Sequence, residues 1–187
     1  MAERTEAGSA QQGPADTQTG ASYLTLAACW RAPSAELVAA VTDGDLRDVF
    51  ERTTAVDLHT LEREFTRLFV GPGDHPCPPY ESVYRDAEAD QSLGPVMGES
   101  TRAVEKWYHE HGVTLAESNP ELPDHVSTEL EFLGYLEQTA DPETARQFRE
   151  EHLDQWIHQF LEDVDAATES PFYRDLVAIT RVALAPT

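Results

Sequence analysis

Apolar residues recur at helical spacing along most of this chain. The clearest run covers residues 57–70, where the apolar positions follow i, i+3, i+7, i+10 and i+11 and are Leu58, Leu61, Phe65, Leu68 and Phe69. This spacing puts them on one face of a helix, as expected for a helix that packs one side against a core. The run ends at Gly71-Pro72-Gly73, a sequence that stops a helix.

Weaker periodic runs predict further helices on both sides of this one. Short helices are expected over residues 23–30, 34–41 and 45–50. A longer helix is expected over residues 97–111, and Gly112 suits the position just after its C-terminus, because glycine adopts the left-handed conformation found there.

The C-terminal half of the sequence is predicted to be helical as well. One helix covers about residues 124–139 with Asp124 as its N-cap. Pro142 suits the first turn of a long helix whose apolar stripe reaches Val164, and Ser170 is placed to cap the last helix. No segment alternates strictly enough to predict a strand. The pattern therefore predicts an all-α protein with a single helical domain.

A proline-rich segment interrupts the helices at residues 71–86, GPGDHPCPPYESVYRD, and its prolines argue against regular helix there. It nevertheless carries apolar and aromatic side chains: Pro78, Pro79, Tyr80, Val83 and Tyr84. Such residues in a long loop either fold back on the core or line a groove, and proline–aromatic surfaces suit a bound peptide. A peptide-binding groove is the functional interpretation that this segment favours.

The charge of the chain excludes several classes of protein. It contains 35 acidic residues against 13 Lys and Arg, a formal charge of −22, and the cations are scattered singly, so no basic stripe for nucleic acid is present. The apolar runs are too short for a membrane-spanning helix. Lys106 is the single lysine, which together with the acid excess resembles adaptation to a salt-rich cytoplasm.

The N-terminal 20 residues show no signal-peptide pattern, so we expect a cytoplasmic protein. They are polar and are predicted to form a disordered tail, residues 1–20, ahead of the helical domain, residues 21–187. The two cysteines, Cys29 and Cys77, do not make a disulfide framework.

Familiar catalytic and nucleotide-binding motifs are absent from the sequence. Three clusters contain metal-ligating side chains, around His75 and Cys77, at His109 and His111, and at Asp124 and His125, but each supplies only part of a ligand set. The alternatives are ordinary structural roles: solvated or capping histidines, a packing role for His152, and an exposed helix face for Glu129 and Glu131.

Two longer motifs resemble a known family. The first runs from Glu64-Phe65 through Gly71-Pro72 and continues as Cys77-Pro78-Pro79-Tyr80-Glu81-Ser82-Val83-Tyr84. The second is Glu121-Leu122-Pro123-Asp124-His125-Val126, followed by Glu129-Leu130-Glu131. Both resemble the hallmarks of the TorD/DmsD family of redox-enzyme maturation chaperones, which includes the nitrate reductase delta-subunit assembly proteins. A looser match follows at His152, Trp156 and Phe160, and the resemblance covers roughly residues 21–185.

The resemblance implies an all-α chaperone that is not an enzyme and has no cofactor. Its implied partner is the apo catalytic subunit of a molybdopterin oxidoreductase of the DMSO, TMAO or nitrate reductase group, bound through its twin-arginine leader. Carboxylates would face the arginines and an apolar trough the rest of the leader. The candidate peptide-binding residues are Phe65, Leu68, Phe69, Pro78, Pro79, Tyr80, Ser82, Tyr84, Glu121, Asp124, His125 and Glu129.

Four questions stay open at this point. The client is either a leader-bearing subunit or, as for delta-subunit proteins, a leaderless N-terminus. A metal-dependent hydrolase using His75, Cys77 and His125 is the rival from another class. The family resemblance is compatible with a monomer or a domain-swapped homodimer, and His125 has either a pH-tuning or an orienting role.

Overall fold

A computed structural model describes residues 14–71, 77–88, 93–116 and 121–185, and every regular element in these ranges is helical. The elements are α1 Pro14–Cys29, α2 Ala35–Thr42, α3 Leu58–Phe65, the π-helical turn η1 Thr66–Val70, α4 Glu81–Arg85, α5 Glu99–Glu110, α6 Val126–Thr139, α7 Pro142–Glu151, α8 Leu153–Ala167 and α9 Pro171–Ala183. The prediction of an all-α fold is confirmed.

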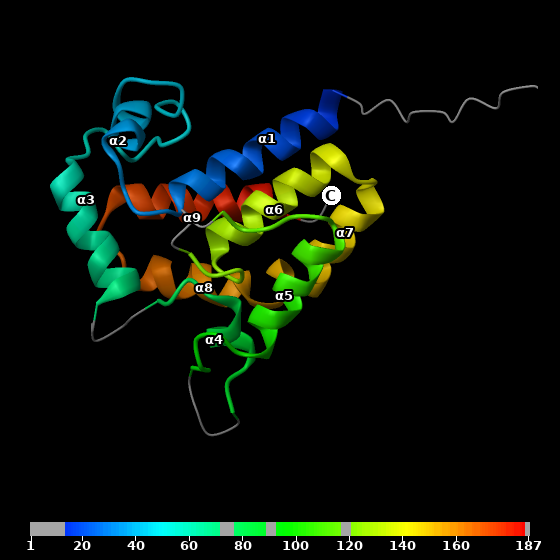
Figure 1. The fold of residues 1–187 in the computed structure, drawn as a ribbon. Helices are drawn as coiled ribbons and strands as arrows, with labels where there is room; N and C mark the ends of the chain where they lie inside the picture. The colour runs from blue at the N-terminus through cyan, green and yellow to red at the C-terminus, as the bar shows by residue number, and fades with distance from the viewer. Residues whose placement is uncertain (1–13, 72–76, 89–92, 117–120, 186–187) are drawn as a thin grey trace, which may run out of the picture.

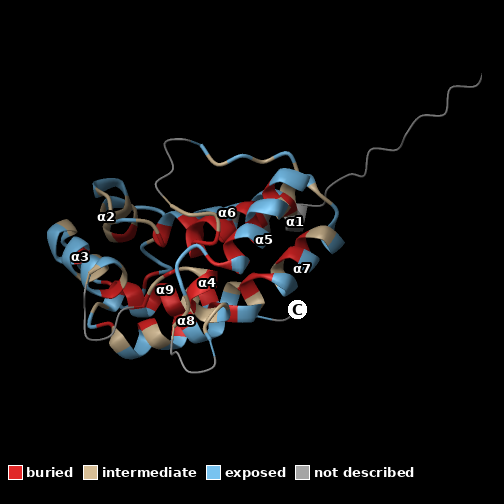
Figure 2. Ribbon diagram, turned by 60° about the horizontal axis from the view of Figure 1, so that its bottom comes forward, coloured by how far each residue is buried: buried red, intermediate tan, exposed pale blue. Residues whose placement is uncertain are grey.

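The helices enclose one apolar core. Helix α1 packs along α6 and also contacts α9, while α8 packs against α4, α7 and α9 (Figure 1). Buried positions line the inward faces of these helices, and the exposed positions face outward (Figure 2). The core therefore joins the first and last described helices to the middle of the chain.

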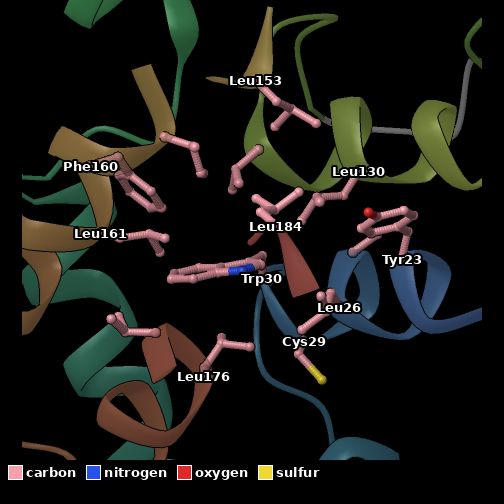
Figure 3. Close-up of a cluster of buried hydrophobic side chains, with 14 of the residues drawn as sticks. Tyr23, Leu26, Cys29, Trp30, Leu130, Leu153, Phe160, Leu161, Leu176 and Leu184 are labelled. Atoms are coloured by element: carbon pink, nitrogen blue, oxygen red, sulfur yellow. The ribbon is translucent and has the colours of Figure 1, made fainter. Parts of the chain in front are cut away.

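Trp30 lies at the centre of this core (Figure 3). Its ring contacts Phe160 with 5.1 Å between centroids, and its Nε1 donates to the Thr180 hydroxyl at 3.1 Å. A buried indole N–H that lacked this acceptor would destabilise the fold, so the bond fixes how the end of α1 meets α9. Phe50 extends the core by stacking on Phe172 at 5.0 Å.

The N-terminal boundary differs from the prediction. Helix α1 begins at Pro14, so residues 14–20 of the predicted tail are helical, while residues 1–13 lie outside the described residues. Proline is tolerated in the first turn of a helix, where the N–H that it lacks has no intrahelical acceptor. The polar composition of this stretch hid the first turns of α1, because they show no apolar periodicity.

Two helix predictions in the body of the chain are wrong. Residues 45–49 form turns and not a helix. The long helix expected from Pro142 is broken at His152, whose φ of −119° and ψ of −86° separate α7 from α8. The break turns the chain so that the buried His152 ring reaches Glu81 on α4. The apolar stripe continues across the break, which is why the periodicity predicted one helix.

The proline-rich segment also contains more structure than predicted. Helix α4 begins at Glu81, after the last proline of the segment, so Pro79 bars helix only up to that point. Other boundaries agree closely with the sequence. Asp57 caps α3 by accepting from the Thr60 N–H at 2.9 Å, and Gly112 follows α5 with a φ of +69°.

Candidate peptide-binding site

The two motif segments lie side by side through backbone hydrogen bonds. The Val126 N–H donates to the Pro79 carbonyl and the Glu81 N–H donates to the Asp124 carbonyl, each at 2.9 Å. These bonds form an isolated antiparallel bridge between Tyr80 and His125. The start of α4 and the start of α6 are therefore held as one unit, although more than 40 residues separate them in the sequence.

Asp124 supports this unit from the inside. Its side chain is fully buried, and Oδ2 accepts from the Ser82 N–H at 3.0 Å, so the carboxylate caps α4 and not α6. The prediction that Asp124 is the N-cap of its own helix is wrong. His125 takes that position, with Nδ1 accepting from the Ser127 N–H at 3.1 Å. A cap provided by a distant residue cannot be read from local sequence.

His125 is held as a neutral ring. Because Nδ1 accepts from Ser127, its proton is on Nε2, which faces Glu121 Oε2 at 3.5 Å. Burial, with the Arg31 guanidinium adding to it, lowers the pKa of His125 to about 3. The ring therefore stays uncharged near neutral pH, and of the two roles considered the orienting one fits the geometry.

A second layer of buried polar side chains lies beneath the bridge. Glu81 accepts from His152 Nδ1 at 2.9 Å and pairs with Arg85. Glu129 is fully buried and accepts from Trp156 Nε1 at 3.3 Å, so the alternative of an exposed helix face is wrong for Glu129. Burial, together with repulsion from Glu81, raises the pKa of Glu129 well above its usual value. This layer ties α4, α6 and α8 together.

Aromatic side chains from α3, η1 and α4 meet over α8. The ring of Phe69 contacts Phe65 at 5.2 Å and Phe160 at 6.2 Å, and Tyr84 contacts Phe160 at 6.1 Å and Trp156 at 5.5 Å. A backbone hydrogen bond joins η1 to the segment that leads into the bridge, because the Cys77 N–H donates to the Leu68 carbonyl at 2.7 Å. These rings are half-buried and form an apolar surface beside the bridge.

The twelve predicted residues thus divide into two groups. Half-buried side chains that reach the surface are Phe65, Phe69, Pro78, Tyr80, Tyr84 and Glu121. Buried side chains that hold the first group in place are Leu68, Pro79, Ser82, Asp124, His125 and Glu129. Tyr80 lies against His125 with 5.3 Å between ring centroids, and Glu121 is close enough to add to the burial effect that raises the Tyr80 pKa.

Sequence reasoning missed three residues that the geometry brings in. Glu81 and His152 pair in the buried layer, and Arg31 interacts electrostatically with both Glu121 and His125. Glu81 stood inside the quoted motif, but its partner His152 had only been expected to pack. Arg31 follows α1, far from both motifs, and carried no sequence signal.

The residues of the metal-site hypothesis are not brought together in the described part of the chain. His75 lies outside the described residues, and Cys77 is a buried thiol whose pKa is raised by burial to about 11. Among the described residues no group of three or more His, Cys, Asp or Glu side chains is arranged to hold a metal ion.

No described helix is long and apolar enough to cross a membrane.

Comparison with known proteins identifies the family. The sequence model of the family described as nitrate reductase delta subunit matches residues 26–162. The chain belongs to this family. The match includes both motif segments and the break at His152, and it ends within α8.

Chaperones are found among the curated relatives of this delta-subunit family member. It is 30% identical over 126 residues to the Tat proofreading chaperone DmsD of Salmonella typhimurium, covering 67% of this chain and 59% of that protein. It is 28% identical over 163 residues to the chlorate reductase assembly chaperone protein of Ideonella dechloratans, covering 80% and 78%. The resemblance to the TorD/DmsD chaperones is confirmed, and these names agree with the expectation of a protein that is not an enzyme.

The chain spans less than three-fifths of the length of DmsD proteins such as those of Salmonella typhimurium and Haemophilus influenzae, 59% and 56%. A solved structure from Archaeoglobus fulgidus, described as a candidate redox enzyme maturation protein, has the same fold. It matches with a TM-score of 0.63 and 22% identity over 97% of this chain and 98% of that one. The delta-subunit family member therefore has the same all-α fold as that structure.

Proposed function

We propose that this protein is a maturation chaperone for the catalytic subunit of a molybdopterin oxidoreductase of the DMSO, TMAO or nitrate reductase group. It binds the apo subunit through a twin-arginine leader and releases it after cofactor insertion. The names of the relatives, DmsD proofreading chaperone and chlorate reductase assembly chaperone, support this role.

The observation that carries the proposal is the pairing of the two motif segments. The bridge brings Tyr80, an aromatic side chain, to the same surface as Glu121, a carboxylate, around the neutral ring of His125. Phe65, Phe69 and Tyr84 continue this surface as an apolar area. A leader with two guanidinium groups followed by apolar residues needs these two kinds of surface next to each other.

The buried members of the predicted set have a different task in this proposal. Asp124, Ser82 and Glu129 do not contact the peptide; they hold α4 against α6 so that Tyr80 and Glu121 stay in register. We assign direct contact to the half-buried residues alone. This changes which substitutions test binding: Tyr80→Ala removes a contact, whereas Asp124→Ala loosens the support.

The test is a titration of the purified chain with a synthetic peptide copied from the N-terminus of the molybdopterin oxidoreductase subunit of the same organism. We expect saturable binding that weakens when both arginines are replaced by glutamine, and again in Tyr80→Ala. Val182→Ala, at an exposed apolar position on α9, is the matched control. Equal affinity for the arginine and glutamine peptides would refute recognition of the leader's arginines.

A second candidate is favoured by the family match itself. The family is described as nitrate reductase delta subunit, and such an assembly protein would bind a client N-terminus that has no leader. A peptide copied from a leaderless subunit separates the two. Binding of that peptide with no dependence on paired arginines would favour the delta-subunit role over the leader-binding one.

A further inference from the structure

An apolar groove lies outside the predicted set of residues. It has a volume of about 630 Å³ and runs between α1, α6 and the segment that follows α5. Its walls are formed mainly by Leu24, Val113, Leu115, Phe132 and Tyr135. We call it the α1–α6 groove.

The walls of the α1–α6 groove are unusually apolar for this chain. Leu24 and Tyr135 are each 39% exposed, on two helices that pack against each other. In a chain with a formal charge of −22, two large apolar side chains exposed on neighbouring helices offer apolar area that another molecule could cover.

A second observation points to a ligand. Thr128 lines the groove and is only 2% exposed, yet its hydroxyl has no hydrogen-bond partner among the described residues. A buried hydroxyl without a partner is unfavourable. A peptide N–H or carbonyl in the groove would satisfy it once the side chains that cover the hydroxyl move aside on binding. The orphan hydroxyl therefore favours a polar backbone as part of the occupant.

The rim of the groove carries the charge that selects the occupant. Arg31 pairs with Glu131, and the same guanidinium counteracts the burial that raises the pKa of Glu121. Two carboxylates thus share one cation. Both members of the Arg31–Glu131 pair are substantially exposed, so the pair is weak and an incoming guanidinium can replace Arg31 on Glu131 at little cost.

We infer that the α1–α6 groove binds a client peptide segment in which an arginine is followed by apolar residues, and that Arg31 holds the acidic rim in the free protein as an internal competitor. The arginine pairs with Glu131 or Glu121, the apolar side chains cover Leu24 and Tyr135, and a backbone group bonds Thr128. Arg31 lines the groove and also interacts electrostatically with Glu121 and His125, so it connects the groove to the residues around Tyr80. The inference rests on the proposed function and adds a second contact region to it.

The decisive variant is Thr128→Val, which keeps the shape of the side chain and removes only the hydroxyl. The fold should be as stable as in the wild type or more so, because the orphan group is gone, while affinity for the arginine-containing leader peptide falls roughly three- to tenfold. Tyr135→Ala should also weaken binding, and Val182→Ala, exposed on α9, should not. Urea unfolding of each variant checks that the fold is intact.

Arg31→Ala tests the competitor. We expect tighter binding of the arginine peptide, by about two- to fivefold, with no gain for the peptide in which both arginines are glutamine. Glu131→Gln should act in the opposite direction. Weaker binding in Arg31→Ala would overturn the competitor role.

The outcomes separate this inference from the proposed function. If neither peptide binds the wild type, the proposed function fails. If the arginine peptide binds and Thr128→Val and Tyr135→Ala leave its affinity unchanged, the groove is overturned and the leader-binding role stands. A concentration-dependent dimer that Tyr135→Ala abolishes would also overturn it, because a second copy of the chain would then be the occupant.

Discussion

Replacing Asp124 with alanine distinguishes support of the site from contact with the peptide. The carboxylate is fully buried, and its Oδ2 accepts from the Ser82 N–H at 3.0 Å. Alanine removes this acceptor and leaves the buried Ser82 N–H without a partner, which costs about 1–3 kcal/mol. The loss resembles the removal of a helix N-cap side chain, which costs a similar free energy. For a domain of this size the melting temperature should fall by roughly 2–12 °C.

Asparagine at the same position provides the matched comparison. It keeps an oxygen for Ser82 but loses the charge, so we expect a destabilisation of about 1 kcal/mol or less. The assay combines urea unfolding, followed by tryptophan fluorescence, with titration of the leader peptide under fully folded conditions. Peptide affinity should fall in Asp124→Ala, because α4 carries Tyr80 at its N-terminus, and should recover in Asp124→Asn.

Two results would refute this reasoning. One is an alanine variant with wild-type stability and weakened peptide binding. The other is an asparagine variant that is stable but binds as poorly as alanine. Either result would mean that the charge of Asp124 meets the peptide directly. Asp141→Ala, which removes the cap of α7 far along the chain, controls for loss of a cap as such and should leave peptide binding unchanged.

Three further predictions concern buried or partly buried ionisable groups. Glu129→Gln should stabilise the protein at pH 7, because folded Glu129 keeps a proton that the unfolded chain releases above about pH 4.3. Measured by urea unfolding, this gain in stability should vanish below that pH. His125 destabilises the fold at low pH instead. Below the unfolded pKa of about 6.5 the unfolded chain binds a proton that folded His125 does not, so stability falls by up to ~1.4 kcal/mol for each pH unit. His125→Asn should make stability less dependent on pH in this range. Although partial burial opposes it, hydrogen bonds from Arg67 and Thr168 lower the pKa of Glu64 to about 2. The stabilisation by ionised Glu64 should therefore be complete above about pH 4.3 and lost as pH falls toward 2. Glu64→Gln should lower the free energy of unfolding at pH 7 by about 1.5–3 kcal/mol, measured by thermal unfolding.

The helices could be predicted wherever one face is apolar and a local residue marks the end. Residues 57–70 satisfied both conditions, and they form helix α3 with Asp57 as its cap, continued by the π-helical turn η1, which the periodicity did not predict. The break at His152 could not be predicted, because the apolar stripe passes through it and the residue that the His152 ring contacts there, Glu81, lies 71 residues away. The start of α1 was missed for the opposite reason, since its first turns have no apolar face.

The candidate site shows the same division between local and distant causes. The motifs selected residues that do lie together, and Tyr80 and Glu121 reach one surface. Their burial was not readable from sequence, because a carboxylate such as Asp124 looks the same whether it faces solvent or caps a distant helix. Arg31 and the α1–α6 groove depend on how α1 packs against α6, which only the fold determines.

The seating of Trp30 has a consequence for synthesis on the ribosome. Its partner Thr180 lies 150 residues later, and the Tyr23 hydroxyl donates to the Ala183 carbonyl across an even longer separation. A nascent chain that lacks α9 can pack α1 along α6, but the Trp30 indole N–H and the part of α1 that meets α9 stay uncovered. The core around Trp30 is therefore completed only after nearly the whole length of the chain has left the exit tunnel.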